Sequence, residues 1–202
     1  MTAVKPSTTA QSDSFGWTPV AMIFIAALAY AIARYGIFGP VPMSQWPTYI
    51  LNKAIAVFAV ATLALSAYNY LKARYRCSKA QGRLVWHAAL IHSAMSLALL
   101  SEDYYPGFFS IKGMNGNGEL AVVFGVLCTY ALWQVSHHTG LNHHRFKRLV
   151  CALALLHLLP MSPNWIKLSS WHGSMPPLSL LSAVITLTAL ILYWRYRPTA
   201  NN

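Results

Sequence analysis

The strongest constraint on this chain is a series of apolar stretches, each long enough to cross a lipid bilayer. Six of them cover roughly residues 17–38, 49–71, 84–100, 119–136, 144–161 and 178–196. A transmembrane helix needs about 20 consecutive, mostly apolar residues. Because the interiors of these stretches are rich in Ala, Leu, Val and Ile and mostly free of charge, the sequence predicts an all-α membrane protein built as a bundle of six transmembrane helices.

The composition excludes the main alternatives. Hydrophobic residues make up 56% of the chain and charged residues only 9%, whereas an ordinary soluble domain carries roughly 25% charged residues. Aromatic residues reach 13%, which excludes a disordered chain. The 15 Lys and Arg residues against four Asp and Glu leave a nucleic-acid binder to consider, but the basic residues stand singly near the ends of the apolar stretches and do not follow one surface.

The distribution of the positive charges predicts the orientation in the membrane. Eleven fall on one side of the six-span arrangement: Lys5, Lys72, Arg74, Arg76, Lys79, Arg83, Arg145, Lys147, Arg148, Arg195 and Arg197. Only Arg34, Lys53, Lys112 and Lys167 fall on the other. Cytoplasmic segments are the ones that carry an excess of Lys and Arg. We therefore expect both termini in the cytoplasm, with five of the charges in a loop between the second and third spans.

The chain divides into one domain and two tails. Residues 1–16 are polar and rich in Ser and Thr, so we expect a flexible cytoplasmic tail there, and residues 198–202 form a short C-terminal tail. The first apolar stretch is too long for a signal-peptide core and has no small-residue cleavage site, so it is expected to stay as an anchor. A single six-helix domain then covers residues 17–197.

Two histidines lie deep inside predicted spans. His92 stands nine residues after Arg83, and His157 stands nine residues after Arg148. Since both basic residues mark cytoplasmic helix starts, each imidazole should sit about 13–14 Å into a core of about 30 Å. Intramembrane ionisable residues are costly and usually functional. Two imidazoles at matched depth can bind one metal from opposite sides, as the axial ligands of a haem iron do.

Two other interpretations of this pair compete with a haem site. An intramembrane histidine is often only a hydrogen-bond partner between helices. A zinc site is disfavoured, because zinc takes about four ligands and no carboxylate or thiolate lies at the depth of His92 and His157.

A second haem near the cytoplasmic face would need further ligands. His144 precedes His157 by 13 residues, but His143, at 14 residues, lies closer to the helix face of His157, so the sequence leaves the choice between them open. On the third helix only His87 is available, and it lies just five residues from His92. The remaining histidines are weaker candidates: His137 and His138 could substitute for His87 or form a solvated loop cluster, and His172 is expected in an outer loop without a special role.

Part of this pattern resembles the ferric-reductase-like transmembrane haem domain superfamily. The resemblance rests on a third helix with a deep histidine and a fifth helix with two histidines separated by twelve residues, His144 and His157. The segment from Trp133 to His138 and the run His144-Arg-Phe-Lys-Arg-Leu-Val resemble the junction of the fourth and fifth helices in that family. In size and layout the chain looks most like the bacterial haem-binding membrane subunit of the periplasmic methionine sulfoxide reductase system, over about residues 48–196.

The resemblance implies particular ligands and a location. His92 and His157 would bind a b-type haem, and His144 would serve a second one. Larger members of the family carry another histidine on the third helix, whereas Tyr105 and Pro106 occupy the corresponding positions here. The family likeness also implies a multi-pass protein of the bacterial inner (plasma) membrane.

The expected activity is electron transfer across the membrane. The sequence has no glycine-rich dinucleotide motif and no P-loop, so a flavin (FMN or FAD) would act only through a partner. Electrons would come from a cytoplasmic flavin reductase or from quinol. They would leave to a periplasmic redox partner or a ferric chelate, as in an oxidoreductase subunit. Arg34 and Lys53 could pair with haem propionates or simply extend toward the lipid headgroups. The alternative function is a non-redox transporter or a structural subunit of a membrane complex.

Overall fold

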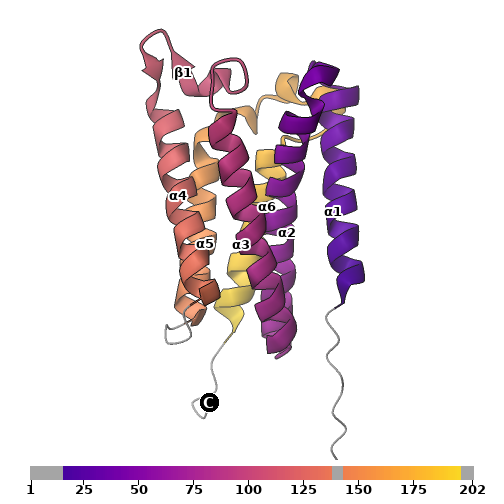
Figure 1. Ribbon diagram of the computed structural model, residues 1–202, viewed down its shortest axis with the longest axis vertical. Coiled ribbons are helices and arrows are strands. Elements are labelled where there is room, and N and C mark those ends of the chain that lie inside the picture. The colour runs from indigo at the N-terminus through magenta and orange to yellow at the C-terminus, as the bar shows by residue number, and fades with distance from the viewer. Residues whose placement is uncertain (1–15, 138–142, 197–202) are drawn as a thin grey trace, which may run out of the picture.

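The protein is described by a computed structural model that covers residues 16–137 and 143–196, without the side chains of residues 143, 144 and 170. Six long helices run side by side (Figure 1). They are α1 (Trp17–Ala31), α2 (Leu51–Leu71), α3 (Tyr75–Ala98), α4 (Gly116–His137), α5 (His143–Leu158) and α6 (Leu178–Arg195). In the described residues, the start of α1 and the end of α6 lie at the same end of the bundle (Figure 1).

Short irregular elements join the helices at the opposite end. A π-helical segment (Ile32–Ile37) extends α1, and the segments Met43–Gln45 and Trp46–Ile50 lead into α2. Between α3 and α4 lie a 3₁₀ turn (Pro106–Phe108) and a two-residue antiparallel hairpin, β1 (Phe109–Ser110) with β2 (Gly113–Met114). Between α5 and α6 lie 3₁₀ turns at Leu159–Asn164, Leu168–Ser170 and His172–Ser174.

Among the described residues, five helical segments are long and apolar enough to cross a membrane: Trp17–Ile37, Met43–Leu71, Gly116–His137, Arg145–Asn164 and His172–Arg195. The chain is therefore a membrane protein. The exception is α3, because its first half carries Arg76, Lys79 and Arg83 and lowers the mean hydropathy of the helix. Our prediction of a charged loop up to Arg83 was wrong: the turn is confined to residues 72–74, and α3 begins at Tyr75.

The helices form a ring with one helix outside it. α2 packs on α3, α3 on α4, α4 on α5, α5 on α6, and α6 on α2, which closes the ring. α1 packs on the outer side of α2 (Figure 1). At the far end of α1, the Tyr30 hydroxyl donates to the Pro176 carbonyl at 2.9 Å, and Arg34 donates to the Met175 carbonyl. These bonds fasten α1 to the segment before α6.

Polar contacts join α2 to α3 near the charged end. The Ser66 hydroxyl lies 2.9 Å from the Ser78 carbonyl and donates to it. The Asn69 amide donates to Oε1 of Gln81 at 3.0 Å, and both of these side chains are buried. Hydrogen bonds of this kind hold transmembrane helices together, because the bilayer interior offers no water to replace them.

We expect Gln81→Leu to destabilise the fold. The substitution leaves the buried Asn69 amide without its acceptor, which should cost roughly 1–3 kcal/mol of unfolding free energy. Thermal unfolding of the detergent-solubilised protein would measure the loss. Gln134→Leu is the matched control, because Gln134 donates to Tyr130 at an exposed position; an equal loss in both variants would contradict the interpretation.

Candidate functional site

A cavity of about 170 Å³ lies within the helix ring. Side chains from α2, α3, α4 and α5 line it, and Ser182 adds a contact from α6. Its walls are mostly aliphatic and include many small residues, among them Ala56, Ala59, Ala89, Ala121, Gly125 and Ala154. His92 and His157 both line this cavity.

A chain of hydrogen bonds holds His92 in one orientation. Its Nδ1 lies 2.7 Å from Oδ1 of Asn52, on α2. The Asn52 amide nitrogen donates to the Ser96 hydroxyl at 3.0 Å and to the Tyr105 hydroxyl at 3.1 Å, which leaves Oδ1 as an acceptor. His92 must therefore carry its proton on Nδ1 and donate it to Asn52. The lone pair of its other ring nitrogen, Nε2, then remains available.

The backbone of α4 holds His157 in the same way. Its Nδ1 lies 2.7 Å from the carbonyl oxygen of Ala121, and a carbonyl can only accept a hydrogen bond. His157 is therefore also protonated on Nδ1 and has an available lone pair on Nε2. Metal-binding histidines in proteins typically donate their other ring N–H to a carbonyl or carboxylate, which fixes the ring and its tautomer.

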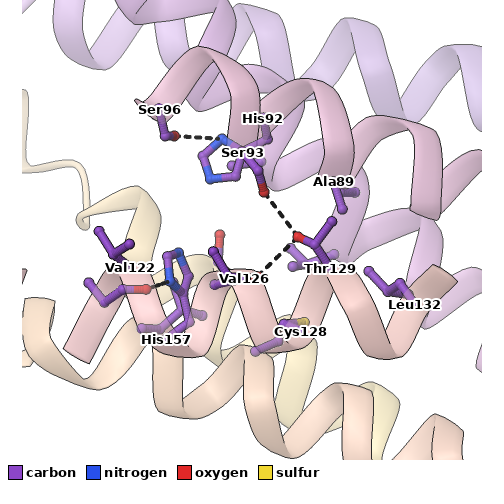
Figure 2. Close-up of a pocket in the computed structure, with 18 of the residues that line it drawn as sticks. Ala89, His92, Ser93, Ser96, Val122, Val126, Cys128, Thr129, Leu132 and His157 are labelled. Carbon is purple, nitrogen blue, oxygen red and sulfur yellow. Dashed lines mark hydrogen bonds between the residues drawn. The ribbon is translucent and has the colours of Figure 1, made fainter. Parts of the chain in front are cut away.

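The two imidazoles face each other across the cavity (Figure 2). Their ring centroids are 6.4 Å apart and their planes are inclined by 80°. Metal–imidazole bonds of about 2.0–2.1 Å on opposite sides of one ion would place two ring centroids about 6–6.5 Å apart. The separation of the rings therefore fits one metal ion bound between two axial histidines.

Gly125 makes room for His157 on the neighbouring helix. A Cβ atom at this position would lie 3.0 Å from Nδ1 and 3.2 Å from Cε1 of His157. One turn further along α4, Thr129 donates to the Gly125 carbonyl at 3.0 Å and lies 3.0 Å from the Ser93 hydroxyl of α3 (Figure 2). These contacts fix α4 between the two helices that carry the imidazoles.

The other histidines do not join this pair. His87 is exposed on α3, where its Nδ1 lies 2.7 Å from the Arg83 carbonyl, and it does not line the cavity that holds His92 and His157. His137 ends α4 at an exposed position and contacts Trp86 edge-on. His172 lies in a 3₁₀ turn before α6, away from the histidine pair. The side chains of His143 and His144, and the whole of His138, lie outside the described residues.

Three partners of the histidine pair escaped the sequence analysis. Asn52 is fully buried (0% exposed) but stands 40 positions before His92, on another helix. Ala121 acts through its backbone carbonyl, which every residue has, so its sequence gives no signal. Gly125 is one of 11 glycines in the chain, and nothing in the sequence distinguishes it from the others. A polar Asn within an otherwise apolar stretch was the one available signal. The two basic residues considered as propionate partners lie in different places. Lys53 lines the cavity, where its ammonium lies 4.7 Å from the ring centroid of Tyr105. Arg34 instead donates to the Met175 carbonyl.

Both imidazoles thus have an Nε2 lone pair available for a ligand, in a cavity whose walls are mostly aliphatic. Within the described residues, no group of three or more His, Cys, Asp or Glu side chains converges on one point. Comparisons of the chain with models of known protein families, with curated protein sequences and with solved structures found no match.

Proposed function

We propose that this protein binds haem b between His92 and His157 and transfers electrons across the membrane. The observation that supports it most strongly is the pair of imidazoles, whose ring centroids lie 6.4 Å apart and whose Nδ1 protons are donated to fixed acceptors, which leaves both Nε2 lone pairs available. Both imidazoles also make hydrogen bonds between helices, to Asn52 of α2 and to the Ala121 carbonyl of α4. These bonds use only Nδ1, so they are compatible with ligation through Nε2, and the haem spectrum distinguishes a ligand role from a structural one.

The residues around the pair suit a porphyrin. The walls of the cavity are mostly apolar and include small side chains on both histidine-bearing helices, Ala89 of α3 and Ala154 of α5. Lys53 is the one cationic side chain among the residues that line this cavity, so it is our candidate partner for a propionate. A haem iron with two imidazole ligands supplies one-electron transfer and has no open position for a substrate. The protein's own task is then to fix both rings and keep the site dry.

We further propose that α3 is the sixth span and that both termini are cytoplasmic. The basic residues of its first half would lie at the inner headgroups, and their aliphatic stems can cover apolar surface while the charges reach water. This orientation places the proposed donor, a flavin reductase or quinol, at the basic end. The acceptor on the outer face would be a periplasmic redox partner or a ferric chelate. We also propose that the chain is a member of the ferric-reductase-like family and lies in a bacterial inner membrane, on the resemblance of its sequence to that family.

Haem binding should depend on both buried histidines. We expect purified wild-type protein reduced with dithionite to show the spectrum of haem b, and His92→Ala or His157→Ala to abolish it, because each substitution removes one axial ligand. His87→Ala is the matched control on α3 and should retain the spectrum. If His144→Ala halves the haem stoichiometry, a second haem is present. Colourless wild-type protein from haem-replete cells would contradict the proposal.

Asn52 should act as a positioning residue that tunes the haem. Asn52→Leu removes the acceptor for the Nδ1 proton of His92, so the imidazole donates less electron density. We expect haem affinity to fall about 10–100-fold and the reduction potential of the remaining haem to rise. Asn52→Asp keeps the acceptor and adds charge, so it should lower the potential. Redox titration measures both shifts. Ser93→Ala, in the same cavity, is the control; identical potentials in all the variants would exclude this role.

The sixth span can be tested by labelling from outside the cell. In a background with Cys77, Cys128 and Cys151 replaced by Ala, Lys112→Cys should react with a membrane-impermeant maleimide in intact cells. Lys79→Cys should react only after permeabilisation, because α3 separates the two positions. Both residues are exposed. If both positions react from the same side, α3 does not cross the membrane; a reversed pattern would reverse the orientation.

A further inference from the structure

A second cavity lies at the basic end of the helix ring. It measures about 280 Å³ and adjoins the histidine cavity, with which it shares Leu63, Leu132 and Val150 as wall residues. Its mouth is formed by exposed residues of two helices, namely Tyr75, Lys79 and Arg83 of α3 and His137 of α4. Its floor is formed by the buried residues Ser66, Ser78 and Tyr193.

Three cations line this basic cavity: Lys79, Arg83 and Lys147. The ammonium of Lys147 lies 3.6 Å from the ring centroid of Tyr70 and 5.6 Å from that of Tyr193. Within the part of the chain that the structure describes, the carboxylate side chains are Glu102, Asp103 and Glu119, and all three belong to the opposite end of the bundle. Clustered positive charges with no counter-charge near them repel one another and favour binding of an anion.

An unused hydrogen-bond donor lies in the same wall. The hydroxyl oxygen of Ser136 is buried and has no hydrogen-bond partner among the described residues, and Ser136 lines this cavity. A buried hydroxyl without a partner is costly, and an anionic oxygen within the cavity would satisfy it.

The surface beside the mouth is apolar and aromatic. Trp86 of α3 and Trp133 of α4 both contact the ring of His137. One turn before Trp133, Tyr130 is 56% exposed, and Leu90 of α3 is 45% exposed. Tryptophan and tyrosine concentrate at the level of the lipid headgroups, and basic pockets between transmembrane helices bind anionic headgroups. The mouth therefore opens where a lipid can place its phosphate inside and its acyl chains along α3 and α4.

We propose that the basic cavity binds the phosphate headgroup of an anionic phospholipid. Lys79 and Arg83 attract the phosphate at the mouth, and Lys147 and Ser136 contact it inside. The bound lipid supplies the negative charge that this end of the bundle lacks, and it fills the gap between α3 and α4 next to the histidine cavity. The site is distinct from the proposed haem site, because His92 and His157 do not line it.

The experiment measures lipid binding to the detergent-solubilised full chain by native mass spectrometry. Phosphatidylglycerol is compared with phosphatidylcholine of the same acyl chains. We expect the wild type to retain phosphatidylglycerol at least tenfold more tightly. Lys147→Gln and Arg83→Gln should each remove most of this preference, whereas Lys112→Gln, the same charge change at the opposite end, should keep it. Since Arg83 is exposed, its variant remains informative if Lys147→Gln does not fold.

Several outcomes would overturn this proposal. Equal binding of both lipids would show that the phosphate charge is not recognised, and an equal loss in Lys112→Gln would indicate a general effect of net charge. Displacement of phosphatidylglycerol by equimolar inorganic phosphate would assign the site to free phosphate, and displacement by riboflavin phosphate would assign it to a nucleotide-like donor. The haem spectrum of each variant is recorded in parallel, so that failure of the haem proposal is distinguished from failure of this one.

Discussion

The hydrogen bonds on the Nδ1 atoms of His92 and His157 constrain the rest of the bundle. Each ring donates to an acceptor on a different helix from its own, Asn52 of α2 for one and the Ala121 carbonyl of α4 for the other. Each of these bonds uses Nδ1, so both Nε2 atoms are left free of them, and both rings line the cavity. The helices that carry the imidazoles cannot rotate or slide without breaking a partly buried hydrogen bond.

This constraint explains why small residues line the cavity. A larger residue at Gly125 would meet the ring of His157, and Ala89 and Ala154 lie on the two helices that face each other across the space. A well-packed interior normally leaves few voids larger than a water molecule. The histidine cavity is such a void, and two imidazoles with available Nε2 lone pairs line it, which is why we propose that it receives a flat, apolar metal complex.

The sequence predicted the helical class and the meeting of His92 with His157, because both depend on spacing along single helices measured from charged helix ends. It was wrong about the segment from Tyr75 to Arg83, since charges near the membrane surface resemble a loop even when they lie on a helix. The partner Asn52 depends on how α2 packs on α3, and the Ala121 carbonyl carries no sequence signal. His87 was the only third-helix candidate for a second haem, but five residues turn a helix by about 140° from the face of His92.

The two adjoining cavities differ in polarity and charge. The histidine cavity is apolar and has one cation, Lys53, toward the end of the bundle that carries the hairpin, whereas the adjoining cavity is more polar and carries three cations. Only the apolar side chains of Leu63, Leu132 and Val150 are shared between them. A charge bound in the basic cavity would lie on the far side of that thin partition from the imidazoles. Because the dielectric constant inside a membrane protein is low, an anion bound in the basic cavity should change the electrostatic energy of a charged group in the histidine cavity. The excess of basic residues therefore does more than orient the chain, since part of it forms the wall of a cavity next to the histidine pair.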